Sequence, residues 1–255
     1  MIAAVLVLGA VAAIAPLPHS RAGSGKDALV LVHGLGGDRH VWDDVVPVLA
    51  KSFTVITVDL PAHGEAPAPA KYDANEIARR IVATADAEGF GASRRVLVGH
   101  SLGGYIVAHA GGEKRALVDI GVGTLFSSQG LAELRANLKK DRESTLKAWF
   151  GAISTPAQLP RILPGVRKLS DEALLGYATM MGTQPVRDPV GGLLMASKIL
   201  LPGKRAQKDE LRDLGFVSVR DLRVVPFAAS MHWIFWDEPQ KFVTTLVDFA
   251  RAELR

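Results

Sequence analysis

The sequence predicts an α/β fold built on a doubly wound, mostly parallel sheet, with a helical insertion. Strand-like runs alternate with helix-like stretches, which is the arrangement of parallel strands joined through helices. The first run, Ala28 to Val32, is apolar at every position, as expected for a strand buried on both faces of a sheet. The alternation stops after Gly123 and resumes about seventy residues later. These three observations indicate one α/β domain with a helical insertion.

The elements before the insertion follow from apolar runs and the residues that end them. Pro61 ends the second strand-like run. Apolar residues on one face and Gly89 beyond the last turn indicate a helix over Ala74–Glu88. Glycines end the first and third runs, at Gly34 and Gly99. The expected strands are 28–32, 53–60, 95–99 and 116–120, and the expected helices are 74–88 and 102–110. The stretch 39–51 is expected to be mostly helical.

The insertion is expected over 123–196, as a cap on the sheet. This stretch is rich in Leu, Met and Trp, and its prolines interrupt any single long helix. Two strands are expected after it, at 198–202 and 222–227, with a helix from about Gln207 between them. A closing helix is expected over 239–253. The α/β domain as a whole is expected to span 26–255.

Composition narrows the function classes. Of 255 residues, 48% are hydrophobic and 22% are charged, which is typical of a globular protein and not of a disordered one. The net charge is +4, but Lys and Arg are scattered, so nucleic-acid binding is not indicated. The chain has no cysteine, which excludes disulfides, thiolate catalysis and cysteine-bound zinc.

The N-terminal residues resemble the core of a secretory signal. The apolar run from Met1 to Pro18 is too short to span a bilayer comfortably, and a Gly/Ser stretch follows it. No Lys or Arg precedes the run, so an N-terminal strand or buried helix is the alternative. Residues 1–25 are therefore interpreted as an export signal or anchor with a linker, and the protein is expected to be periplasmic or secreted, with the cytoplasm as the alternative. No other integral membrane segment is expected.

The motif G-H-S-L-G places Ser101 between an expected strand and an expected helix. Small residues on both sides suit a sharp turn with positive φ. The turn would present the Ser101 hydroxyl at a helix N-terminus, where N–H groups point toward a developing anion. Ser101 is therefore a candidate nucleophile. A plain helix cap is the alternative, since serine is a common N-cap.

The motif H-G-L-G-G, His33 to Gly37, follows the first strand. Its backbone can supply one donor to an oxyanion, from Leu35, while Leu102 supplies the other. A simple glycine turn is the alternative. The spacing does not form G-x-G-x-x-G and no G-K-[ST] follows, so neither dinucleotide nor ATP binding is indicated.

H-G-L-G-G, D-L-P-A-H-G, G-H-S-L-G-G and S-M-H-W-I-F-W-D-E-P occur in that order. Together they resemble the α/β-hydrolase superfamily over nearly the whole chain after Lys26. The resemblance implies an α/β-hydrolase fold and a catalytic histidine after the last strand, where His232 stands. A structural histidine between Trp233 and Trp236 is the alternative. The other histidines either belong to loop motifs (His33, His63 and His100) or to no motif (His19, His40 and His109).

The acid that should hold the histidine is the open question. Most proteins resembling this chain carry it after the penultimate strand, but Lys204 and Arg205 stand there, and the nearest carboxylates are Asp209 and Glu210. Some relatives place the acid after the strand that follows the nucleophile helix, where this chain has Asp119. That strand should lie beside the serine strand and open on the same crevice. Asp119, the Asp209/Glu210 pair and no acid at all remain the alternatives.

The resulting hypothesis is a serine hydrolase that cleaves carboxylic esters of small molecules through an acyl-enzyme. It requires no metal or organic cofactor. A lactonase, an amidase, a hydrolase of carbon–carbon bonds and a non-catalytic ligand-binding protein are alternatives on the same fold. An apolar acyl or alcohol group is expected because the insertion carries many large apolar residues, although such residues can also be its core. The expected pocket residues are His33, His100, Phe126, Trp149, Met180 and Trp233, with Leu125, Phe150 and Met181 as further apolar candidates.

Overall fold

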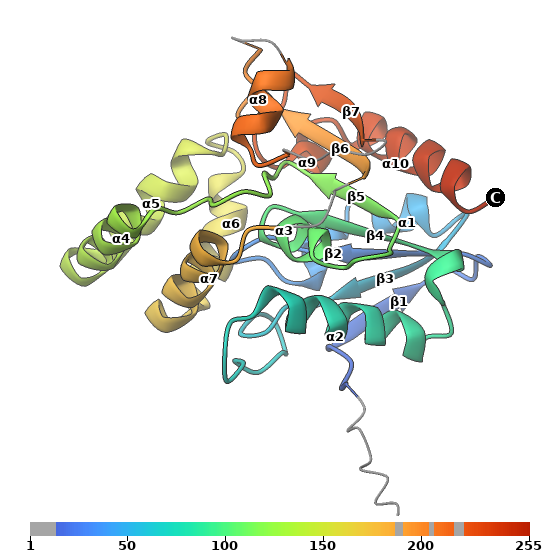
Figure 1. Ribbon diagram of the computed structural model, residues 1–255, viewed down its shortest axis with the longest axis horizontal. Coiled ribbons are helices and arrows are strands. Elements are labelled where there is room, and N and C mark those ends of the chain that lie inside the picture. The colour runs from blue at the N-terminus through green and yellow to red at the C-terminus, as the bar shows by residue number, and fades with distance from the viewer. Residues whose placement is uncertain (1–13, 187–190, 204–206, 217–221) are drawn as a thin grey trace, which may run out of the picture.

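A computed structural model describes residues 14–186, 191–203, 207–216 and 222–255. Its core is a seven-stranded sheet in the order β1-β3-β2-β4-β5-β6-β7 (Figure 1). β1 is antiparallel to β3, and all the other pairs are parallel. The predicted fold class is thereby confirmed. The strands are β1 (His19–Ala22), β2 (Ala28–Val32), β3 (Thr54–Val58), β4 (Arg95–His100), β5 (Arg115–Val118), β6 (Gly192–Ser197) and β7 (Leu222–Phe227).

The central strands are buried on both faces. Every residue of β2, β3, β4 and β5 is buried, which explains why these runs do not alternate polar and apolar residues. Helices α2 (Ala74–Ala87) and α3 (Leu102–Ala108) pack against each other on one face, and α1 (Val46–Leu49) and α10 (Pro239–Glu253) pack on the other (Figure 1). The sheet therefore forms the middle layer of three.

The stretch 39–51, expected to be mostly helical, contains two short helical elements and not one helix. The segment forms a 3-10 turn, η1 (Arg39–Trp42), and the single-turn helix α1. Pro47 lies in the first turn of α1, where its missing N–H leaves no hydrogen bond unmade. A proline suits a helix start and not a helix interior, so the segment divides there. The remaining short elements are η2 (Ala92–Arg94), α8 (Gln207–Asp213) and α9 (Ile234–Asp237).

Among the described residues between β5 and β6, four helices form the helical insertion, beside the sheet in Figure 1. Ser127, Asp141 and Ser170 cap three of them, each accepting a backbone N–H with its side chain. Pro160 lies in the first turn of the remaining helix. The helices are α4 (Ser128–Lys140), α5 (Arg142–Ala152), α6 (Leu159–Lys168) and α7 (Asp171–Thr183).

The insertion ends earlier than the expected boundary at 196. The strand after it is β6, Gly192–Ser197, which pairs with both β5 and β7. The run 198–202, predicted as this strand, lies beyond its end, and Ile199 is exposed. Periodicity alone cannot separate two adjacent short apolar runs. The parallel ladder selects the run that is buried on both faces.

The sheet also begins before the expected start at Lys26. β1 pairs along its whole length with β3. Leu17 is buried, and its backbone N–H donates to Thr84 Oγ1 over 2.8 Å. Residues 14–25 are therefore part of the domain and not a free linker. Most of the expected export segment, 1–13, lies outside the described residues, and among the described ones no helix has the length and apolar character to cross a membrane.

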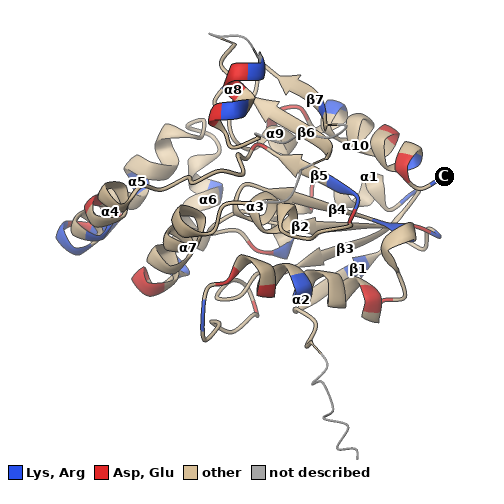
Figure 2. Cartoon of the chain, in the orientation of Figure 1, with Lys and Arg blue, Asp and Glu red and all other residues tan. Residues whose placement is uncertain are grey.

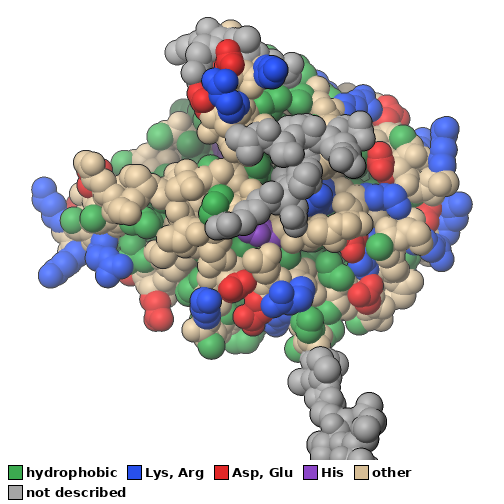
Figure 3. All heavy atoms as spheres, viewed as in Figure 1, with side chains coloured by type: hydrophobic (Ala, Val, Ile, Leu, Met, Phe, Trp, Pro, Cys, Tyr) green, Lys and Arg blue, Asp and Glu red, His purple; other side chains and the backbone are tan. Residues whose placement is uncertain are grey.

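Charged side chains are mixed over the molecule. Figure 2 shows Lys and Arg next to Asp and Glu on α2, α4 and α8. On the face in Figure 3, acidic and basic groups again alternate, with apolar groups between them. Among the described side chains visible in Figure 3, the basic groups do not form one continuous stripe of the kind that tracks a nucleic-acid backbone.

Candidate active site

Ser101 stands on a sharp turn between β4 and α3. Its backbone has φ 52° and ψ −122°, a strained conformation for a residue with a side chain. Two glycines allow this turn. A Cβ on Gly99 would lie 2.4 Å from the carbonyl oxygen of Gly103, and one on Gly103 would lie 2.4 Å from that of Val32. The glycines of G-H-S-L-G therefore let α3 start directly against the sheet, with Ser101 at its N-terminus.

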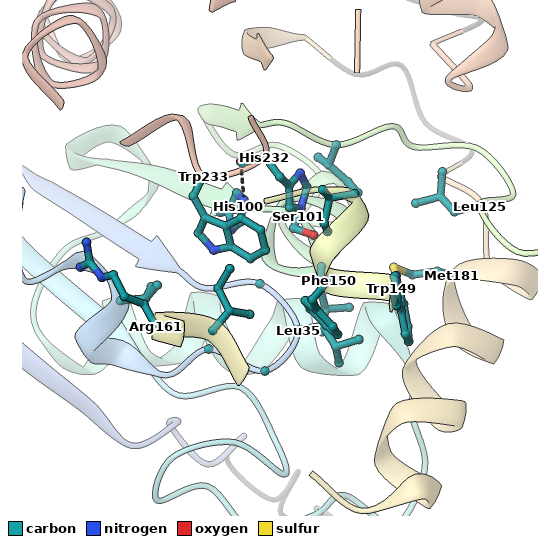
Figure 4. A pocket seen from close by; sticks show the side chains of 18 of the residues that line it. Leu35, His100, Ser101, Leu125, Trp149, Phe150, Arg161, Met181, His232 and Trp233 are labelled. Carbon is teal, nitrogen blue, oxygen red and sulfur yellow. Dashed lines mark hydrogen bonds between the residues drawn. The ribbon is translucent and has the colours of Figure 1, made fainter. Parts of the chain in front are cut away.

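His232 lies in the loop between β7 and α9, and its ring is held by Asp119. The His232 Nδ1 atom is 2.6 Å from Asp119 Oδ2, and the carboxylate is buried. Because an ionised carboxylate can only accept, this contact selects the tautomer with the proton on Nδ1 and a lone pair on Nε2. Figure 4 shows the His232 ring next to Ser101 at the cavity. The structure thus brings Ser101, His232 and Asp119 together.

Asp119 directly follows β5, and its backbone conformation and hydrogen bonds fix the position of its carboxylate. Like Ser101, Asp119 has a positive φ of 52°. Ser197, the last residue of β6, donates its backbone N–H to Asp119 Oδ1 over 2.6 Å and its hydroxyl to Asp119 Oδ2 over 2.9 Å. Three donors therefore converge on the buried Asp119 carboxylate and fix its orientation.

The alternative acids lie elsewhere. Asp209 is on α8, where its carboxylate is 3.4 Å from Arg212. Glu210 is buried on the same short helix. Lys204 and Arg205 lie outside the described residues. At the end of the penultimate strand, where most relatives were expected to carry the acid, this chain has Ser197, which supports the carboxylate of Asp119 from the neighbouring strand.

Two backbone contacts hold the His232 loop. The His100 ring donates from Nε2 to the His232 carbonyl oxygen over 3.0 Å. The His232 N–H donates to the carbonyl oxygen of Ile153, just past α5, over 3.1 Å. Burial and the nearby His232 ring lower the pKa of His100 well below its usual value, so His100 is neutral. His100 therefore positions the backbone of His232, and the insertion binds the same loop through the Ile153 carbonyl oxygen.

Two further neutral histidines hold the H-G-L-G-G loop. His33 Nε2 accepts from the Leu60 N–H, and His63 Nε2 accepts from the Gly36 N–H, each over 3.0 Å. Burial lowers the pKa of His33 to about 4 and that of His63 to about 3, the latter also through the neighbouring His33. Both rings must be neutral to accept these bonds. They fix the loop that carries Leu35, and both Leu35 and Leu102 line the cavity.

The cavity has a volume of about 200 Å³ and opens above Ser101. The insertion forms one wall, which is almost wholly apolar, and the loops around His100 and Trp233 form the other (Figure 4). The lining residues are Gly34, Leu35, Gly36, Gly37, Val41, His100, Ser101, Leu102, Ile120, Leu125, Phe126, Trp149, Phe150, Ile153, Arg161, Ile162, Met181, His232, Trp233 and Trp236.

Most of the expected pocket residues line this cavity, but two do not. His33 is buried behind the H-G-L-G-G loop, where both ring nitrogens bond to backbone groups. Met180 is buried away from the cavity, whereas the next residue, Met181, lines it. Successive helical residues point about 100° apart, and on α7 this turns Met181 toward the cavity and Met180 away from it.

Sequence reasoning missed Arg161 and Trp236 as lining residues. Trp236 is in the aromatic segment after His232, and this proximity was the available signal. Arg161 had no signal, because it is one of several basic residues in the insertion and only the packing of α6 brings it to the cavity.

Comparisons with known proteins agree with this architecture. A sequence model of the alpha/beta hydrolase family matches residues 29–245. Over 88 residues the chain is 36% identical to a pimeloyl-[acyl-carrier protein] methyl ester esterase of Edwardsiella ictaluri. The match covers 34% of this chain and 32% of the relative, so the chain matches about a third of that protein's length.

Solved structures match over a greater length. An esterase from Exiguobacterium antarcticum superposes with a TM-score of 0.75 at 22% identity, covering 91% of this chain and 94% of the other. An enol-lactonase from Burkholderia xenovorans superposes with a TM-score of 0.72 at 20% identity, covering 91% and 95%. At these identities the likeness shows the shared fold.

Proposed function

Since the chain belongs to the alpha/beta hydrolase family, we propose that it is a serine hydrolase that cleaves carboxylic esters of small molecules through an acyl-enzyme. The observation that carries the proposal is the 2.6 Å contact between His232 Nδ1 and the buried Asp119, at the cavity that Ser101 lines. A named esterase among the sequence relatives supports the same reaction class.

In the proposed first half-reaction, Ser101 is the nucleophile and His232 the general base. The lone pair on His232 Nε2 takes the hydroxyl proton while Ser101 Oγ forms a bond to the ester carbonyl carbon. The carbonyl oxygen becomes an oxyanion. The imidazolium then returns its proton to the leaving alkoxide as the carbon–oxygen bond breaks, which gives a free alcohol and an acyl-serine. Asp119 stays ionised throughout and stabilises the imidazolium.

The second half-reaction repeats these steps with water. His232 takes a proton from water, the hydroxide oxygen attacks the acyl carbon, and the proton passes to Ser101 Oγ as the acid product leaves. In both halves the Leu35 and Leu102 N–H groups are assigned to the oxyanion. Removing one such donor typically costs about 10²–10³ in rate. Because these donors belong to the backbone, the position of the Leu35 N–H depends on the H-G-L-G-G loop. The neutral His63 holds this loop by accepting the Gly36 N–H.

The cavity supports a small, mainly apolar substrate. Its volume of about 200 Å³ lies below the roughly 300–1,000 Å³ of sites for drug-sized ligands. Leu125, Phe126, Trp149, Phe150 and Met181 line the insertion side. A short acyl group buried there would leave water and would need no charged partner.

Two measurements on the purified protein test the proposal. Short p-nitrophenyl esters should be turned over, and a fluorophosphonate probe should label Ser101. Ser101→Ala should abolish both signals, while Ser127→Ala, a helix cap outside the cavity, should keep them. Equal turnover by Ser101→Ala and the unchanged protein would refute the assignment. Absence of both labelling and turnover would favour a non-catalytic ligand-binding protein.

A further inference from the structure

A series of stacked groups leads from His232 to the rim of the cavity. The Trp233 ring meets the His232 ring edge to face, with centroids 5.0 Å apart and planes at 90°. Trp233 and Trp236 lie near parallel, at 13°, with centroids 5.9 Å apart. The Arg161 guanidinium carbon lies 4.0 Å from the Trp236 ring centroid. We call Trp233, Trp236 and Arg161 the aromatic ladder.

The aromatic ladder forms one wall of the cavity, and all three members line it. In Figure 4, Trp233 lies between Ser101 and Arg161. Apart from Arg161, which comes from α6, the lining residues of the insertion are aliphatic, thioether and aromatic side chains without a charge. The two sides of a bound ester would therefore meet chemically different surfaces.

Hydrogen bonds hold the aromatic ladder in place before any ligand binds. Trp236 Nε1 donates to the Val41 carbonyl oxygen over 3.2 Å, and Arg161 Nη2 donates to Asp44 Oδ2 over 2.8 Å. Trp233 is only 5% exposed. Rigid, preorganised aromatic surfaces lose little conformational entropy when a flat ring binds to them.

Arg161 gives the rim end of the aromatic ladder a positive charge. It is the one Lys, Arg, Asp or Glu among the described lining residues. Within the described part of the chain, its hydrogen bond to Asp44 uses one nitrogen of a guanidinium that has five N–H donors. The Arg161 and Asp44 side chains are both about half exposed, and an ion pair at such a position contributes little to the free energy of folding. Donors therefore remain for an anionic ligand, which Arg can bind with two parallel hydrogen bonds.

We propose that the aromatic ladder is a subsite for an aromatic ring that carries a carboxylate. The ring would lie on Trp233, and the carboxylate would meet Arg161 at the rim. This inference rests on the proposed function for its position next to Ser101. It adds a substrate class to that function: esters in which one side is apolar and the other is an aromatic acid.

Binding of three small probes to the full chain, measured by titration calorimetry, tests the subsite. Benzoate is flat and charged, cyclohexanecarboxylate is charged but not flat, and benzamide is flat but neutral. Benzoate should bind about fivefold or more tighter than either of the others, the size expected of one cation contact or one ring contact at a half-exposed site. Equal binding of all three probes, or no binding of benzoate, would overturn the proposal.

Variants separate the two contributions. Arg161→Gln should remove the difference between benzoate and benzamide, whereas Arg167→Gln, on the same helix but paired with Glu143, should not. Trp233→Leu should remove the difference between benzoate and cyclohexanecarboxylate, and Trp233→Phe should keep it. Unchanged benzoate binding by Arg161→Gln would also refute the subsite.

The subsite and the catalytic assignment fail separately. Benzoate binding does not need the nucleophile, so Ser101→Ala should bind it as well as the unchanged protein does. Selective benzoate binding without Ser101-dependent ester turnover would refute the hydrolase and leave the subsite standing. Ester turnover that depends on Ser101, together with non-selective probe binding, would refute the subsite alone.

Discussion

Replacing Asp119 with Asn is the sharpest test of how His232 is held. Asp119 accepts three hydrogen bonds, two from Ser197 and one from His232 Nδ1. An Asn side chain has one oxygen and one NH₂ group, so it cannot accept all three. If its oxygen stays with the Ser197 N–H, its NH₂ group faces His232 Nδ1. The imidazole must then present a lone pair at Nδ1 and its proton at Nε2, where it cannot take a proton from Ser101.

The expected loss is large because the wrong tautomer removes the base. The corresponding Asp-to-Asn change in a serine protease lowers kcat about 10⁴-fold, which corresponds to about 5 kcal/mol. We expect a loss of about 10³–10⁴ in kcat/KM for a p-nitrophenyl ester, with little change in KM. Asp209→Asn is the matched control, because Asp209 lies on α8 beside Arg212, and it should keep full activity. Activity of Asp119→Asn within tenfold of the unchanged protein, at an unchanged melting temperature, would refute the reasoning.

Three further predictions concern the supporting residues. Ser197→Ala removes one of the donors to Asp119 and should lower kcat several-fold at constant KM in the same ester assay; no change would mean that the remaining contacts suffice to orient the carboxylate. His100→Leu should lower kcat about tenfold through the lost bond to the His232 carbonyl, and His100→Gln, which keeps an N–H donor, should recover part of it; equal rates in the two variants would contradict this role. Burial lowers the pKa of His63 from 6.5 to about 3 in the folded protein. As pH falls below 6.5 the unfolded chain therefore gains a proton that the folded protein does not, and the free energy of unfolding decreases by about 1.4 kcal/mol per pH unit. Urea unfolding of His63→Gln should therefore show a shallower loss of stability between pH 6.5 and 4.5 than the unchanged protein does, and parallel pH curves would contradict the assignment.

The predicted fold was recoverable because local pattern and tertiary structure agree over the central strands. Ala28–Val32 reads as a buried strand and is one, since a strand covered on both faces must be apolar throughout. The expected run at 198–202 was wrong because two apolar runs adjoin there, and pairing with β5 and β7 selects 192–197. The start at Lys26 was wrong because β1 is polar and half exposed, so its composition resembles a linker.

The candidate site divides in a similar way. The turn at Ser101 could be predicted from the sequence, because its glycines and the start of the following helix all lie within a few residues. The cavity walls are not local. Met180 and Met181 have the same composition signal, yet only Met181 lines the cavity, and Arg161 reaches it only through the packing of α6. Which side chains of a helix face the cavity depends on where the helix packs, and residue spacing along the chain does not determine that.

By itself, the sequence determined the α/β alternation and the glycine-flanked turn at Ser101, because the residue types suit the backbone conformations that these features require. The position of the histidine after the last strand came from the resemblance to α/β hydrolases. Only the tertiary structure decided which carboxylate meets His232. Asp119 is 113 residues away from it, and the contact exists because β5 lies beside both the serine strand and β6, whose Ser197 holds the carboxylate in place. Partners so distant in sequence meet through the strand order, which no local pattern encodes.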